Sequence, residues 1–192
     1  MMAAAEHAEA KDPVQRAAVL VGLFHPRGES FASFTEVAAA AVPQPHRDLL
    51  DHRSHMTAAM ERHHGGPVSL RVVACEGPHD APDGSGWYAR EILLLGPTGA
   101  VVQHGIVRID LAALSPPDAA LVRGGMIPLG RVLMSAGVLC RVHDVALLAI
   151  EPGPSLAALI GTHATFGRVA TIRVDGRPAI ELLEIVVEDG DR

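Results

Sequence analysis

Apolar residues in the first third of the chain recur every three to four positions, a spacing typical of helices that pack through one face. An Asp-Pro start followed by this repeat predicts a helix over 13–24. The same spacing predicts a second helix over 34–41, and two further short helices follow, one near residue 45 and one over 57–64. The amino-terminal part is therefore predicted to be helical.

Beyond residue 66 the apolar positions alternate, as they do in strands with one buried face. VSLRVVAC predicts a first strand, and WYAREILLL with AVVQHGIVRIDL predicts an antiparallel hairpin. The stretch 77–86 between them is rich in Gly, Pro and Asp and is predicted to be a surface loop. A strand over 138–150 and a closing hairpin that turns at Asp175 and Gly176 complete the set.

Three prolines mark the starts of helices among these strands: Pro116, Pro128 and Pro154. Strands that occur in pairs, rather than in strict alternation with helices, indicate the α+β class. We therefore predict an antiparallel β-sheet with helices packed on one face. The chain is expected to form one compact domain, with an N-terminal helical segment over 1–44 and the main domain over 45–192.

The amino-acid composition and net charge exclude several classes of function. Hydrophobic residues make up 48% of the 192 residues and charged residues 20%, which is enough apolar material for a core. A net charge of -6 argues against a nucleic-acid partner, which requires clustered basic residues. No apolar run is long enough to cross a bilayer, and the first residues do not resemble a secretion signal. We expect a cytoplasmic protein with no membrane partner.

Arg90 lies in the middle of a predicted strand, and its neighbours on the same face, Tyr88, Ile92 and Leu94, are mostly apolar. An unpaired charge in such surroundings is costly. Two interpretations stay open from the residues alone: an internal salt bridge, or a clamp for an anionic ligand.

Glu184 stands in a similar position on the last predicted strand, among Ile180, Leu182 and Val186. A carboxyl group there can donate or accept a proton in catalysis, or can pair with Arg90. Glu181, on the opposite face, competes for any such role.

The helix that starts at Pro128 exposes the N–H groups of Leu129 and Gly130, which can hold a carboxylate, although every helix has such an end.

Several kinds of site lack their usual motifs. The histidines at 52, 55, 63 and 64 match no zinc spacing. Cys75 and Cys140 form no CxxC pair and are predicted to be isolated buried thiols. Glycine-rich nucleotide motifs and the serine-hydrolase elbow are also missing from the sequence. We predict no metal and no cofactor.

Five strings occur in a characteristic order over roughly residues 45–187: LLDHRSHMTAAMERHHG, WYAREILLL, the glycine of VVQHGIVRI, IPLGRVLM and GRVATIRVDGRPAIELLEIV. Together they resemble the chorismate pyruvate-lyase family. The resemblance implies an antiparallel sheet flanked by helices, a fold shared with the UTRA-type ligand-sensing domains of certain transcription regulators. It also implies cofactor-free conversion of chorismate to 4-hydroxybenzoate and pyruvate.

The resemblance further implies a role for each matched residue. Arg90 would bind the ring carboxylate, and Met56 and Leu129 would contact the ligand through main-chain groups, with Gly130 beside them. Gly105 would line a buried pocket, and Glu184 would face the oxygen at the para carbon. Arg90 and Glu184 would be the catalytic pair. The partner would be an aromatic or cyclohexadiene carboxylate, and the oligomeric state is not implied.

The chain departs from the family pattern at two places. It is one residue longer between Pro178 and Glu184, which requires either a bulge or a different position for Glu184. It is also longer over 146–166, which suits an alternative function as a tailoring enzyme with another substrate. A further alternative is a non-catalytic module that binds aromatic acids. Only about 45 residues precede the matched region, which disfavours a preceding DNA-binding domain.

Overall fold

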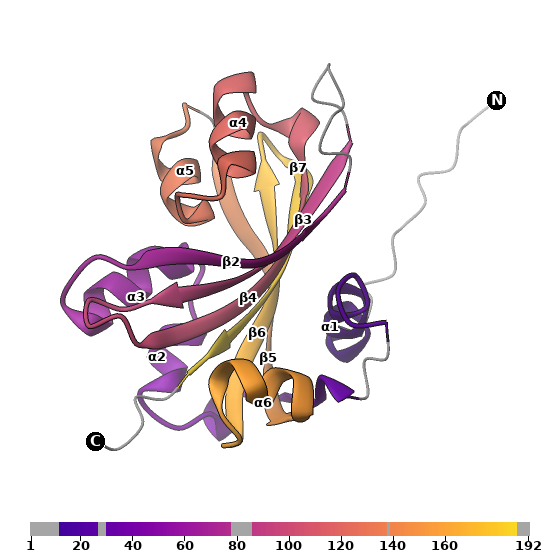
Figure 1. Cartoon of the computed structure of the whole chain (residues 1–192), viewed down its shortest axis with the longest axis vertical. Coiled ribbons are helices and arrows are strands. Elements are labelled where there is room, and N and C mark those ends of the chain that lie inside the picture. The colour runs from indigo at the N-terminus through magenta and orange to yellow at the C-terminus, as the bar shows by residue number, and fades with distance from the viewer. Residues whose placement is uncertain (1–11, 27–29, 78–85, 138, 188–192) are drawn as a thin grey trace.

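A computed structural model describes residues 12–26, 30–77, 86–137 and 139–187. Its centre is one antiparallel sheet of seven strands in the order β1-β5-β6-β7-β4-β3-β2 (Figure 1). The strands are β1 (Ala32–Val37), β2 (Ser69–Glu76), β3 (Trp87–Leu95), β4 (Val101–Asp110), β5 (Cys140–Pro152), β6 (Thr165–Val174) and β7 (Arg177–Val186). The helices are α1 (Pro13–Val21), α2 (His46–Leu50), α3 (Met56–His64), α4 (Pro116–Gly124), α5 (Leu129–Ser135) and α6 (Pro154–Ile160).

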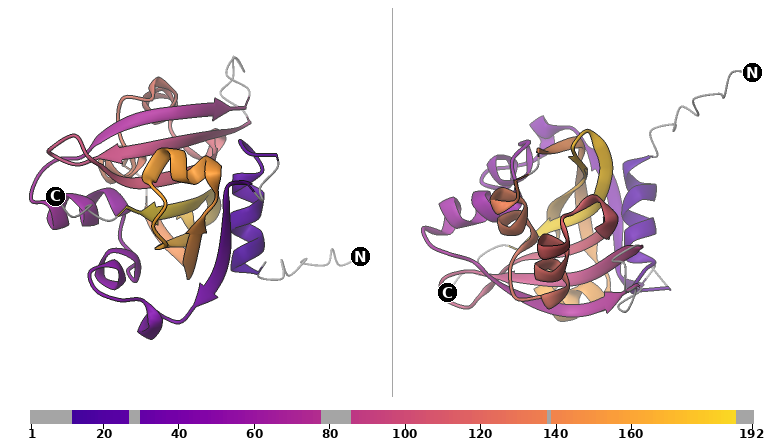
Figure 2. Two further views of the ribbon diagram at one scale, coloured as in Figure 1. Left: turned by 60° about the horizontal axis from the view of Figure 1, so that its bottom comes forward. Right: turned by 90° about the horizontal axis from the view of Figure 1, so that it is seen from above.

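The predicted α+β class and antiparallel sheet are confirmed, but helices cover both faces of the sheet rather than one. α1 and α6 pack against one face, and α2 to α5 cover the other (Figure 2). The apolar side chains of α1 and α6 join one core cluster with residues such as Leu183 of β7. Because side chains alternate along a strand, the neighbouring Leu182 belongs to the core on the opposite face.

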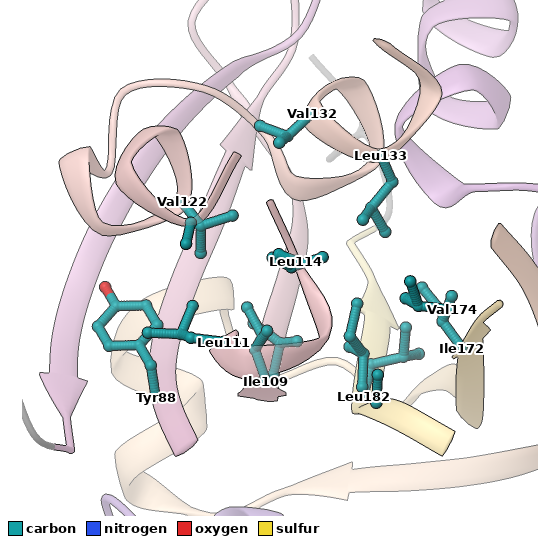
Figure 3. Close-up of a cluster of buried hydrophobic side chains, with 14 of the residues drawn as sticks. Tyr88, Ile109, Leu111, Leu114, Val122, Val132, Leu133, Ile172, Val174 and Leu182 are labelled. Atoms are coloured by element: carbon teal, nitrogen blue, oxygen red, sulfur yellow. The ribbon is translucent and has the colours of Figure 1, made fainter. Parts of the chain in front are cut away.

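The core beneath α4 and α5 consists mostly of aliphatic side chains, with Tyr88 as its single large ring (Figure 3). Val122 of α4 and Val132 and Leu133 of α5 point down onto this layer. Their burial fixes both helices over the strands, since each fully buried side chain of this size contributes roughly 1.5–3 kcal/mol. This packing sets the height of the first turn of α5 above the sheet.

The predicted helix over 34–41 is wrong. Residues Ala32–Val37 form the edge strand β1, which pairs with the long strand β5, and only a single 3-10 turn follows at Ala39–Ala41. Phe34 and Val37 have helical spacing, but FTEV contains β-branched residues, and pairing with β5 decides in favour of the strand. α1 and β1 thus attach the segment before residue 45 to the main sheet.

The other elements lie close to their predicted positions. β3 has the predicted bounds, and Asp175 and Gly176 both have positive φ, as the tight turn of the closing hairpin requires. The predicted loop over 77–86 lies almost wholly outside the described residues. Both cysteines are free thiols, and Cys75 Sγ lies 3.1 Å from the hydroxyl oxygen of Tyr88.

Candidate functional site

A cavity lies between the sheet and the first turns of α3 and α5, and it contains about 590 Å³ of space free of protein atoms, including the part open to solvent. Strands β2 to β7 form its floor and walls. The side chains and turns that line it are mostly apolar, with the polar groups of His55, Thr57, Arg90, Gln103, Arg168 and Glu184 among them.

All six residues singled out from the sequence line this one cavity. Arg90, Gly105 and Glu184 come from β3, β4 and β7, while the remaining three come from the helices above. Those three are Met56 at the start of α3 and Leu129 and Gly130 at the start of α5. The structure therefore brings together residues that are up to 128 positions apart in the sequence, counted from Met56 to Glu184. Their individual roles stay predictions.

Gly105 has no side chain and so leaves space at the floor of the cavity. It lies directly opposite Glu184 on β7 and Ile92 on β3. A Cβ atom at this position would stand 3.2 Å from Ile92 Cδ1, tighter than ordinary contact. A larger residue would crowd this neighbour and fill space next to Glu184.

Arg90 is buried, with only 1% of its surface exposed. Its Nη1 donates to the carbonyl of Val122 at 3.0 Å, and its Nη2 donates to the carbonyl of Ile127 at 3.5 Å. Within the described part of the chain it forms no salt bridge, and its Nε is buried without a hydrogen-bond partner. The described residues therefore offer Arg90 no partner for the internal salt bridge, which was one of its two interpretations.

The same burial acts on the charge of Arg90. Removal from water lowers the pKa of its guanidinium from the ordinary value, and the neighbouring Tyr88 and Cys75 act in the opposite direction. Burial likewise raises the pKa of Tyr88 to about 12, so its hydroxyl stays protonated at neutral pH. A buried guanidinium that meets carbonyl groups but no carboxylate is a strong attractor for an anion.

Glu184 is held by a residue that the sequence reasoning missed. Arg168 on β6, also 1% exposed, lies directly opposite it, and its Nε donates to Glu184 Oε2 at 2.7 Å. The other oxygen of Glu184 has no hydrogen bond to any described residue. Glu184 is 14% exposed, so this carboxyl group is fixed by one oxygen and open at the other.

Arg168 also fixes the segment that leads into α3. Its Nη1 donates to the carbonyls of Leu50 at 3.3 Å and His52 at 2.8 Å, and its Nη2 donates to the carbonyl of Ser54 at 3.3 Å. A single buried side chain therefore joins Glu184 to the loop that places the first turn of α3 over the cavity.

The competing acid, Glu181, lies on the opposite face of the sheet. It pairs with Arg108, and both side chains are more than a third exposed. A bulge lies at Ala179, since Ile172 pairs with Ile180 and Arg173 pairs with Pro178. With this bulge, Glu184 faces the cavity.

The two helix starts touch above the cavity. A Cβ atom on Gly130 would stand 2.6 Å from Thr57 Oγ1, so only glycine allows α5 to approach α3 this closely. Neither α3 nor α5 has a side-chain cap at its start, and the N–H groups of a first turn have no acceptor within their own helix. An ion pair between Arg131 and Glu61 also joins the two helices.

Two histidines of the loop and helix start have altered basicity. Burial lowers the pKa of His55, and the positive charge of Arg168 adds to this while Glu184 opposes it. His52 shows the same direction for the same leading cause, again with a contribution from Arg168. No group of three or more metal-ligating side chains gathers among the described residues.

A second buried polar cluster, also missed from the sequence, lies under the other face of the sheet. Glu91 Oε1 lies 2.8 Å from Nε2 of His104 and 3.0 Å from Nε2 of His25. Burial raises the pKa of Glu91, but the hydrogen bonds from the two histidines outweigh it and the pKa falls below its ordinary value. This cluster ties the segment after α1 to β3 and does not line the cavity.

No protein-family model matches the chain, and neither does any curated protein sequence. Among solved structures, the chain is similar to the ligand-binding domain of a GntR-family transcriptional regulator from Bordetella bronchiseptica, with 16% identity and a TM-score of 0.49, covering 64% of this chain and 86% of that one. It is also similar to the effector domain of PhnF from Mycobacterium smegmatis, with 17% identity and a TM-score of 0.47, covering 71% and 90%. Among the described residues, no helix has the length and apolar character to cross a membrane.

Proposed function

We propose that this chain is a chorismate lyase-type enzyme, which converts chorismate to 4-hydroxybenzoate and pyruvate without a cofactor. The observation that supports this most directly is the state of Arg90, buried beside the cavity with no carboxylate among the described residues and with an unpartnered Nε. The ring carboxylate of a substrate would supply the missing charge and accept the free hydrogen bonds.

The spacing of the polar groups fits a ligand that contains one six-membered ring. Arg90 pairs across the sheet with Val107, and Glu184 pairs with Gly105, so the two rows are two residues apart on β4. Two residues of a strand span about 7 Å, which suits one substituted six-membered ring. The carboxylate would lie at Arg90 and the ring oxygen near Glu184.

The reaction balances without any added reagent. The bond between the ring carbon and the enolpyruvyl oxygen breaks, and the neighbouring hydroxyl-bearing carbon loses its proton as the ring becomes aromatic. A proton is added to the methylene carbon of the enolpyruvyl fragment, which leaves as pyruvate. Orientation by Arg90 and one proton acceptor meet these needs, and the open oxygen of Glu184 is available as that acceptor.

The test is release of pyruvate from chorismate by the purified chain, measured with a lactate dehydrogenase coupling assay. We expect release well above background, and its absence would refute the proposed activity. Glu184→Gln should lower kcat by roughly 10²–10⁴-fold while 4-hydroxybenzoate still binds. Arg108→Gln, which alters an exposed arginine on the opposite face, serves as the control.

The carboxylate clamp has a test of its own. Arg90→Ala should abolish binding of 4-hydroxybenzoate in isothermal titration calorimetry, because the principal charge partner of the ligand is lost. Unchanged affinity would refute the clamp whether or not the chain is a lyase.

A second candidate function is a non-catalytic module that binds an aromatic acid. It is favoured by the pairing of Glu184 with Arg168, which already occupies one oxygen of the proposed proton acceptor. Tight binding of 4-hydroxybenzoate without pyruvate release would support this candidate, and turnover of a different ring carboxylate would support a tailoring enzyme.

A further inference from the structure

Gln103 is a buried amide that none of the roles above uses. It is 2% exposed, lies on β4 and lines the cavity. Its Oε1 is buried and has no hydrogen-bond partner among the described residues. Most buried side-chain polar groups in folded proteins have at least one partner. An amide oxygen that lines a cavity and has no partner among the described residues can therefore form a hydrogen bond with a ligand.

The position of Gln103 shows which part of a ligand it would meet. It lies two residues before Gly105, on the same face of β4, and opposite Val186. A Cβ atom on Gly105 would stand 3.6 Å from Gln103 Nε2, so the amide leans over the floor of the cavity. Since Arg90 pairs with Val107 in the other direction along β4, Gln103 and Arg90 lie toward opposite ends of the cavity.

The surroundings of Gln103 do not explain an amide. Leu94 and Val186, which lie opposite it on the two neighbouring strands, are buried and apolar. A leucine or methionine would suit these neighbours as well, without a buried unpaired oxygen. An amide differs from them because it can both accept a hydrogen bond from a hydroxyl group and donate one to an oxygen.

We propose that Gln103 is a specificity-determining residue that hydrogen-bonds an oxygen substituent at the end of the ligand remote from its carboxylate. This inference rests on the proposed function, because it takes Arg90 as the carboxylate end. The cavity would then select hydroxylated ring carboxylates over benzoate itself. A site built around a hydrogen bond to a substrate hydroxyl rejects the analogue that lacks it, because its own buried group is left unpaired.

The experiment compares the Kd values of benzoate and 4-hydroxybenzoate, measured by calorimetry, for the unaltered chain and for Gln103→Leu. The unaltered chain should prefer 4-hydroxybenzoate, and the substitution should reduce this preference by about tenfold with little change in the affinity for benzoate. Gln103→Met, which keeps the length of the side chain, should behave in the same way. Thermal unfolding of both variants should occur at or above the original temperature, because an unpaired polar group is removed.

Each result decides the assignment. A preference that changes less than about threefold in both variants would overturn the role of Gln103, as would loss of folding in both. Failure of the unaltered chain to bind either acid would overturn this inference together with the carboxylate clamp. A lost preference in a chain that releases no pyruvate would support Gln103 as a binding residue and refute only the lyase activity.

Discussion

Arg90 and Arg168 are the same residue type, are buried to the same 1% exposure and line the same cavity, yet their surroundings differ. Arg168 meets a carboxylate and three backbone carbonyls. Arg90 meets two carbonyls, no carboxylate among the described residues, and has a buried Nε without a partner. Burial therefore does not distinguish these two arginines. The unfilled hydrogen-bonding capacity does.

The difference follows from what each strand faces. β6 brings Arg168 next to Glu184 and beneath the loop before α3, so protein groups surround its guanidinium on several sides. β3 brings Arg90 beneath α4 and the turn before α5, which supply only carbonyl oxygens. This difference supports the proposal that Arg168 supports the site and that Arg90 binds the ligand.

The largest expected effect is that of Arg168→Met on stability. The substitution leaves the largely buried Glu184 without its partner and three carbonyls without a donor, so the free energy of unfolding should fall by about 3–5 kcal/mol. Denaturant titration followed by circular dichroism measures this loss.

The matched control for that substitution is Arg108→Met. It breaks another pair between arginine and glutamate on β7, but both of its side chains are more than a third exposed. Its cost should stay below about 1 kcal/mol. Equal losses in the two variants would contradict the structural role assigned to Arg168.

Arg90→Met should have a smaller effect, and one of the opposite sign, on the protein without ligand. Methionine replaces a buried charge that lacks a carboxylate, so the free energy of unfolding should stay unchanged or rise by about 1 kcal/mol. The same denaturant titration applies, and a loss as large as that of Arg168→Met would show that Arg90 has a protein partner after all.

The smallest expected effect is a change in the pKa values of His52 and His55. Both have folded-state pKa values below the ordinary 6.5, so the unfolded chain takes up protons first as the pH falls. Their contribution to stability is complete above pH 6.5 and is lost as the pH drops toward the lowered values. NMR titration should show both pKa values rising in Arg168→Met, whose lost charge opposes protonation of these rings, and unchanged in Arg90→Met.

Much of the fold follows from local sequence signals. Period-two alternation predicted β3, and an Asp-Gly turn predicted the last hairpin, because both signals are complete within a few residues. The strand β1 was predicted as a helix because the apolar residues of FASFTEV have helical spacing, and only the pairing of this segment with β5 makes it a strand. The covering of both sheet faces was also missed, since it depends on which side of the sheet α1 and α6 pack.

Part of the lining of the cavity was predictable from the sequence, but the contacts between its residues were not. Alternation along β3 and β7 was sufficient to place Arg90 and Glu184 on apolar faces. Nothing local distinguishes Arg168 from the other arginines of its hairpin, because its partners lie 114 to 118 positions away in the loop and 16 away on β7. For Gln103 a signal did exist, since it stands two residues from Gly105 on the same strand face.

The close approach of Gly130 to Thr57, together with the ion pair between Arg131 and Glu61, has a kinetic consequence. If a ligand lies beneath both helix starts and leaves between them, the lifetime of the complex depends on this contact as well as on Arg90. The ion pair is partly exposed, and dissolved salt weakens such pairs. Ligand exchange is therefore expected to become faster as the ionic strength of the solution rises.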